Sequence, residues 1–214
     1  MIKIEWMMMR FLLFCIVCAT LLSCATKKDI NKRLLPEGIK SATEEIYLIV
    51  NNQHKLLQKK QLVFTRNGRI KYSISFDSLG NIIQETKKKL WFIVETYPYK
   101  EPYYCKTRWK PKQRERISCY TRKQYKQNEA IYYYNKDGTI EKIVDNFTTF
   151  YTQYYYYTLH ELTAIVTKDK NNQLIDEIVV HCETKDEKGV CIKETRVSKI
   201  TNLQEEVWFM PQYK

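Results

Sequence analysis

Four cysteines beyond residue 100 are spaced for two cross-strand bridges. A hairpin that turns midway between Cys105 and Cys119 places these two residues opposite each other, and a second hairpin does the same for Cys182 and Cys191. An even number of cysteines in an oxidising compartment normally forms disulfides. Because two independent registers each pair cysteine with cysteine, we predict the bridges Cys105–Cys119 and Cys182–Cys191.

The same cysteines fit metal binding and catalysis poorly. Their spacings lack the Cys-x-x-Cys pattern of structural zinc sites, and His181 next to Cys182 would point to the opposite face of a strand. A cysteine nucleophile needs a histidine base with an orienting partner, and the neighbouring residues supply neither. We therefore expect no metal site, no catalytic cysteine and no cofactor.

The segment around the first cysteine pair is strongly basic. Residues 97–126 contain ten Lys or Arg and two Glu, in a chain of formal net charge +12. In the register set by the cysteines, one face holds Tyr103, Cys105, Thr107 and Trp109 opposite Thr121, Cys119, Ile117 and Glu115, and we expect it to face the core. The other face holds Tyr104 opposite Tyr120, Lys106 opposite Ser118, Arg108 opposite Arg116 and Lys110 opposite Arg114.

Two like-charge pairs on one hairpin face need an explanation, because each is unfavourable by a fraction of a kcal/mol to about 1 kcal/mol. One explanation is an anion site, in which Arg and Lys meet phosphate or carboxylate groups and the tyrosines add stacking surface. We expect a polyanion, an acidic glycan or an acidic protein rather than nucleic acid. The other explanation is a solvated face whose charges keep an edge strand from pairing with neighbours.

Tyrosine is concentrated in the same part of the chain. Fourteen of the 17 Tyr fall between residues 97 and 157, including the runs Tyr132 to Tyr134 and Tyr154 to Tyr157. A run of four in a strand places two side chains on each face, so exposed members could form a platform for carbohydrate. The alternative is that they only cover a thin sheet.

Known enzyme motifs are absent from the sequence. The three histidines, His54, His160 and His181, lie in no metalloprotease, nucleophile-elbow or phosphate-loop context. Adjacent carboxylates such as Glu205-Glu206 would point to opposite faces of a strand. We expect no catalytic residues. The enzymatic alternative is a glycosidase, which would need a deep pocket with two carboxyl groups roughly 5 to 10 Å apart.

The chain after Glu44 alternates with a period of two residues. Over 69–76, Ile70, Tyr72, Ile74 and Phe76 alternate with polar residues, which predicts a half-buried strand with its apolar face inward. Similar runs cover 45–50, 62–66, 90–97, 130–134, 148–158, 161–167, 174–184, 190–200 and 203–210. We therefore expect one all-β domain over 45–214, an antiparallel meander of hairpins forming a single- or double-layer sheet.

Turn signals separate these runs. Asn67-Gly68 and Asp137-Gly138 predict two-residue hairpin turns, since such pairs adopt the positive φ angles that these turns need. The segments 76–82 and 134–140, and less closely 64–70, resemble the aromatic, Asp/Asn, x, x, Gly, x, aliphatic hairpin of YD-type β-repeats in bacterial surface and toxin-associated proteins. Ordinary hairpins are the alternative.

The N-terminus has the pattern of a targeting segment. An apolar stretch over 11–22 behind Arg10 is too short for a bilayer span of roughly 20 residues but suits a secretory signal. It ends in Leu21-Leu22-Ser23-Cys24, which resembles the lipobox of bacterial lipoproteins. The resemblance implies that a signal helix over 1–23 is removed together with Cys15 and Cys18, and that Cys24 is diacylated and anchors the protein to a membrane.

The residues that follow Cys24 are expected to form a tether. The segment 24–44 is polar, contains Pro36 and Gly38, and has no sustained apolar period. Ala25 directly after the cysteine resembles lipoproteins sent to the outer membrane. The sequence thus predicts a lipid-anchored binding or structural component of the cell envelope, on the periplasmic or the surface face. The alternatives are a glycan-processing enzyme of the envelope and a toxin-associated, immunity-type lipoprotein.

Overall fold

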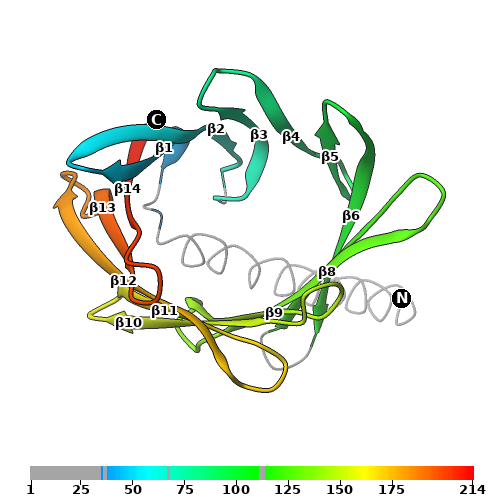
Figure 1. Ribbon diagram of the computed structural model, residues 1–214. Coiled ribbons are helices and arrows are strands. Elements are labelled where there is room, and N and C mark those ends of the chain that lie inside the picture. Colours follow the sequence, from blue (N-terminus) through cyan, green and yellow to red (C-terminus); the bar gives the residue numbers. More distant parts are fainter. Residues whose placement is uncertain (1–34, 36–37, 67, 111–113) are drawn as a thin grey trace, which may run out of the picture.

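The computed structural model describes Leu35 and residues 38–66, 68–110 and 114–214, with only the backbone of Trp109 and Lys110. The signal segment 1–23 and Cys24 lie outside the described residues. Within the described part, fourteen antiparallel strands form a closed barrel (Figure 1). They are β1 (Ile39–Val50), β2 (Gln53–Phe64), β3 (Ile70–Asp77), β4 (Ile82–Lys88), β5 (Ile93–Tyr97), β6 (Lys100–Lys110), β7 (Arg114–Tyr120), β8 (Lys126–Tyr134), β9 (Ile140–Asp145), β10 (Thr152–Thr158), β11 (Glu161–Lys168), β12 (Leu174–Lys185), β13 (Cys191–Ser198) and β14 (Gln204–Tyr213).

Each strand pairs with its neighbours in sequence, and β1 pairs with β14 to close the barrel (Figure 1). The expected all-β antiparallel meander is confirmed. The sequence analysis did not predict that the sheet closes into a barrel. β1 begins at Ile39, inside the segment 24–44 that the sequence analysis assigned to a tether. An irregularity between Ile39 and Ser41 interrupts the alternation there, which hides the start of the strand. The described residues include no helix long and apolar enough to cross a membrane.

Six hairpin turns share one geometry. The N–H of the first residue donates to the carbonyl of the fifth residue, and the N–H of the fourth residue donates to the carbonyl of the first. The turns are 65–69, 77–81, 121–125, 135–139, 169–173 and 186–190. Where all its residues are described, this turn is a three-residue loop that ends in a bulge residue with positive φ, as in the common hairpin loop built on a type I turn. The expectation of a two-residue turn at Asp137-Gly138 is wrong, because Gly138 has a φ of 95° and Asp137 does not have a positive φ.

The barrel wall has an apolar inner cluster at the end where β1 begins. The buried residues of this cluster are Leu35, Ile39, Ala42, Leu62 and Phe64. Other parts of the inner face hold buried polar residues, such as Ser73, Ser75 and Glu115. The barrel interior is therefore not a uniform hydrophobic core.

Strand β3 shows this polarity and reverses a prediction. Ser73 and Ser75 are 4% and 2% exposed, and Ser73 pairs with the core residue Leu62, so the serines face inward. The apolar side chains Tyr72, Ile74 and Phe76 lie on the outer face instead. Alternation identifies two faces of a strand but does not say which one points into a closed barrel.

The predicted register of the first hairpin is confirmed. β6 and β7 pair Cys105 with Cys119, and the two sulfurs form a disulfide. The cysteines are 1% and 5% exposed, and Glu115 on the same face is buried. The face assigned to the core therefore points into the barrel, and Arg108 and Arg116 stand opposite each other on the outer face.

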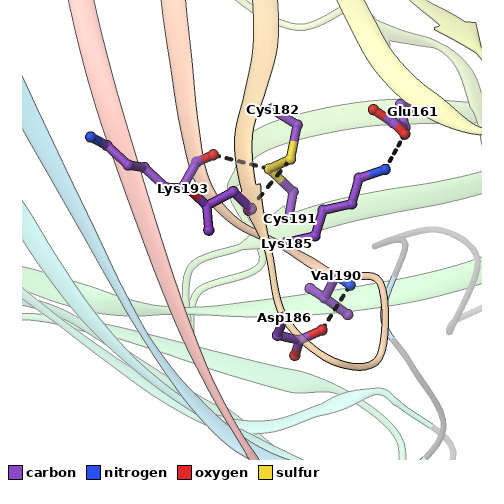
Figure 2. Close-up of polar contacts among 8 residues, drawn as sticks. Glu161, Cys182, Lys185, Asp186, Val190, Cys191 and Lys193 are labelled. Carbon is purple, nitrogen blue, oxygen red and sulfur yellow. Dashed lines mark hydrogen bonds and ion pairs between the residues drawn. A yellow bond between two sulfur atoms is a disulfide. The ribbon is translucent and has the colours of Figure 1, made fainter.

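The second disulfide, Cys182–Cys191, is also confirmed, but the predicted register of its hairpin is wrong (Figure 2). β12 and β13 pair Cys182 with Glu194 and Lys185 with Cys191. The turn starts at Asp186, whose carboxylate accepts the Val190 N–H at 2.9 Å, and its bulge residue moves β13 along β12. Irregular pairing around position 184 then brings the cysteines together.

Candidate anion-binding surface

The outer face of the β6–β7 hairpin holds the predicted anion-binding residues side by side. Lys106 and Arg108 are exposed, and the other described members are half-buried. The side chain of Lys110 lies outside the described residues, although its backbone pairs with Arg114. We name the described set the basic surface: Tyr104, Lys106, Arg108, Arg114, Arg116 and Tyr120.

A carboxylate that the sequence analysis missed lies beside the basic surface. Glu129 of β8 stands opposite Ser118, whose hydroxyl donates to it at 2.8 Å. Lys126 Nζ lies 2.9 Å and Arg116 Nε 3.8 Å from the same carboxylate. Burial disfavours the charged form, but the hydrogen bonds from Lys126 and Ser118, together with the Arg116 charge, overcome it and lower the pKa of Glu129 to about 2. Glu129 is therefore a fixed anion.

Glu129 changes the interpretation of the opposed arginines. Arg116 stands opposite Arg108 across the hairpin, and its Nε lies 3.8 Å from Glu129, which is diagonal to it on β8, so the protein itself offsets part of the repulsion. The opposed pair is thus not, on its own, evidence for a ligand. Within the described residues, however, neither Lys106 nor Arg108 forms an ion pair, and both are exposed. These two side chains can meet an external anion.

A line of alternating cations and tyrosines extends from the basic surface across the outer wall. Arg114 of β7, Tyr133 of β8, Lys142 of β9 and Tyr154 of β10 stand opposite one another in successive strand pairs. The cation-to-ring distances are 5.9 Å for Arg114 to Tyr133, 4.9 Å for Lys142 to Tyr133 and 5.9 Å for Lys142 to Tyr154. Lys168 of β11 lies 5.8 Å from the Tyr154 ring. We name these five residues the cation–tyrosine row.

All five residues of the row are half-buried. Lys142 has a side chain that is 29% exposed, and its ammonium lies 3.7 Å from the Glu141 carboxylate as well as between two rings. An aromatic ring attracts a cation through its quadrupole and carries no charge of its own. The rings therefore hold the cations in place without neutralising them.

The tyrosine run over 154–157 is divided between the two faces of β10. Tyr154 contacts the cations of the outer face, and Tyr156 is half exposed. Tyr155 and Tyr157 are on the inner side, where burial raises the pKa of each phenol to about 12. Only the outer members can contribute to an external binding surface.

The barrel interior holds a cavity of about 730 Å³ with two acidic residues in its lining, Glu95 and Glu115. Glu95 stands opposite Tyr103 and Glu115 opposite Trp109, so their backbones lie roughly 20 Å apart along β6 at about 3.3 Å per residue. A glycosidase needs carboxyl groups within about 10 Å. The register does not provide that pair here.

Both cavity carboxylates already have hydrogen-bond donors. The Tyr97 hydroxyl donates to Glu95 at 3.0 Å, and the Tyr134 hydroxyl donates to Glu115 at 2.6 Å. Such contacts fix the carboxylates in the wall of the barrel. They give these residues a structural use that needs no substrate.

One cluster in the cavity wall has metal-ligand atom types. Glu95, Cys105 and Cys119 present ligand atoms within 4.8 Å of one another. The two sulfurs are joined in a disulfide, so neither is the thiolate that a metal needs. We assign no metal to this cluster.

Comparison with known proteins assigns no family to this chain. No protein-family model and no curated protein matches the sequence. Similar solved structures include a porin-like protein from Bacteroides uniformis (8% identity, TM-score 0.41, covering 78% of this chain and 58% of that one). A LolA superfamily protein from Nitrosomonas europaea is also similar (6% identity, TM-score 0.40, covering 86% of this chain and 90% of that one). So is a DUF1329 family protein from Desulfovibrio piger (9% identity, TM-score 0.33, covering 82% of this chain and 86% of that one). The chain thus spans little more than half the length of the porin-like protein.

Proposed function

We propose that this protein is a lipid-anchored component of the cell envelope that binds an anionic polymer through the basic surface. One observation carries the proposal: Lys106 and Arg108 are exposed and without an ion pair in the described structure, beside Arg114 and Arg116 on the same face. An anionic polymer supplies the missing counter-charge, and charge-assisted hydrogen bonds to Arg and Lys are strong.

The topology of the barrel supports a position near the membrane. β1 starts at Ile39, and in a meander the β6–β7 turn lies at the same end of the barrel as the start of β1. Arg108 and Arg114 are close to that turn. With a lipid on Cys24, the chain up to Ile39 would span at most about 50 Å. The basic surface would then reach phosphates and acidic glycans at the surface of the anchoring membrane.

The replacement of Arg108 and Arg116 together with Gln tests the binding. Wild type should bind heparin and lipopolysaccharide with an affinity that falls as salt rises, and the double variant should bind at least roughly tenfold more weakly. Lys59→Gln with Lys193→Gln, which removes two cations from another part of the outer wall, is the matched control and should bind as wild type does. Equal binding by all three proteins would rule out the basic surface as the site.

The replacement of Cys24 with Ala tests the anchor. Wild type should partition into the detergent phase and the variant into the aqueous phase, since two acyl chains are needed for stable attachment. Mass spectrometry of the mature N-terminus checks that residues 1–23 are removed. Aqueous partitioning of both proteins would end the lipoprotein interpretation while leaving the binding experiment valid.

A further inference from the structure

The cation–tyrosine row repeats with a period of two strands. Neighbouring strands lie about 4.8 Å apart, so Arg114 on β7 and Lys142 on β9, which share one line of cross-strand pairs, lie about 10 Å apart. Lys168 follows two strands farther on, on β11, displaced by two residues along the strand because it stands opposite Thr152. The rings of Tyr133 and Tyr154 stand on the strands between them. A ligand that uses the whole row must therefore be linear and must present a negative charge at every second step.

A linear acidic polysaccharide has this form. An extended chain of pyranose rings advances by close to one strand spacing per ring, and the apolar face of a sugar ring packs on aromatic side chains. Carboxylates on alternate sugars would meet Arg114, Lys142 and Lys168, and the uncharged sugars between would lie over Tyr133 and Tyr154. A single-stranded nucleic acid fits less well because every nucleotide carries a phosphate.

We propose that the cation–tyrosine row binds a linear acidic polysaccharide in which charged and uncharged sugars alternate, lying across the strands from β7 to β11. This inference rests on the proposed function, because Arg114 belongs to both the row and the basic surface, and it specifies the class of polymer. Lys142, Tyr154 and Lys168 lie outside the basic surface. The row can therefore be tested separately from the hairpin.

The test uses variants that change one property of the row at a time. Lys142→Met removes a charge, Tyr154→Leu removes a ring, and Lys142→Arg keeps both the charge and the ring contact. Lys87→Met is the matched control. Lys87 of β4 lies 5.5 Å from the ring of Tyr72 of β3, which is a cation–ring contact outside the row. Thermal melts of all four variants establish that they are folded.

Three probes distinguish the ligand classes in calorimetric titrations at low salt. Hyaluronan oligosaccharides carry a carboxylate on every second sugar, oligogalacturonates carry one on every sugar, and oligothymidylate carries one phosphate per nucleotide. Wild type should bind the hyaluronan probe tightest. Lys142→Met and Tyr154→Leu should each weaken that binding roughly fivefold to tenfold, in line with the loss of about 1 kcal/mol. Lys142→Arg should bind more tightly than Lys142→Met because it retains the charge, and Lys87→Met should bind as wild type does.

The outcomes separate this inference from the proposed function. Tighter binding of oligogalacturonate or oligothymidylate, or no effect of Lys142→Met and Tyr154→Leu, would overturn the alternating-glycan assignment. If the Arg108 and Arg116 double variant still loses heparin affinity in that case, the basic surface stands and the row is only structural. If wild type binds none of the probes, heparin and lipopolysaccharide included, both proposals fail.

Discussion

Two parts of the outer barrel wall use their cations differently. On β13, β14, β1 and β2, Lys59 lies 2.8 Å from Glu45 and Lys193 lies 2.9 Å from Glu206, and we name these four residues the ion-paired surface. On β7 to β11, the cations of the cation–tyrosine row contact rings, and Lys142 also lies 3.7 Å from the Glu141 carboxylate. A carboxylate neutralises its lysine, whereas a ring only positions it. The first surface therefore offers an anion little, whereas the ring contacts of the second surface do not offset the charge of its cations.

The acids of the ion-paired surface are held by protein donors. Hydrogen bonds from Lys59 and Tyr47 lower the pKa of Glu45, and the same contact raises the pKa of Tyr47 to about 12. Burial opposes the charge of Glu206, but hydrogen bonds from Lys193 and Trp208 overcome it and lower its pKa. Proximity of opposite charges alone therefore does not mark a binding site. What differs on the basic side is the excess of cations around Glu129.

The two disulfides allow the largest test, since each bridge attaches to an edge strand of one region: Cys119 lies on β7 and Cys191 on β13. Replacing Cys105 and Cys119 with Ala should lower the free energy of unfolding by about 3 kcal/mol, and replacing Cys182 and Cys191 by about 2.5 kcal/mol, because the loops span 14 and 9 residues. Because Cys105 and Cys119 are buried, the difference between the two losses of unfolding free energy should be larger still. Urea denaturation measures both values.

The same two variants should differ in binding. Because the first bridge fixes the register that aligns Arg108 with Arg116, its loss should weaken heparin binding, and loss of the second should not. A larger effect of the second bridge on either stability or binding would contradict the comparison between the two regions.

The replacement of Glu129 with Gln should have the next largest effect. Its folded pKa of about 2 lies below the ordinary value of 4.5, so its contribution to stability is complete above pH 4.5 and is lost as the pH falls toward 2. The variant should lose about 2 kcal/mol at pH 7 and show a flatter stability profile below pH 4.5. Chemical denaturation at several pH values measures this.

Glu129→Gln should also tighten polyanion binding, because it removes the acid beside Arg116. Glu206→Gln is the comparison variant from the ion-paired surface, and it should destabilise the fold without changing the binding. Weaker heparin binding by Glu129→Gln at low salt would show that Glu129 organises the site rather than competing with the ligand.

Local patterns in the sequence predicted much of the fold. Alternation identified most strands, and the positions of Cys105 and Cys119 set the register of their hairpin correctly. The register between Cys182 and Cys191 was wrong because the turn lies later in the chain than the cysteine positions imply: Lys185 stands opposite Cys191, and the loop ends in a bulge residue, Gly189. A single extra residue is enough to move every pair in a hairpin.

The candidate site was predictable only within one hairpin. Lys106, Arg108, Arg114 and Arg116 come from adjacent strands whose register the cysteines fix. Lys142 gave no signal, since its place between two tyrosine rings depends on the pairing of β8, β9 and β10. The sequence also did not show which face of each strand points into the barrel. That depends on the pairing of β1 with β14, the first and last strands, which closes the barrel.

The smallest expected effect comes from double-mutant cycles that compare one ion pair with one cation–ring contact. Lys59→Met with Glu45→Gln measures an ion pair, and Lys142→Met with Tyr154→Leu measures a cation–ring contact. Each coupling should be about 0.5 kcal/mol in low salt. In 1 M salt, where the screening length is about 3 Å, the coupling between the full charges of Lys59 and Glu45 should vanish, while the coupling of Lys142 to an uncharged ring falls less. If the coupling between Lys142 and Tyr154 is zero at both salt concentrations, the ring does not hold the cation, and the row loses the feature that separates it from the ion-paired surface.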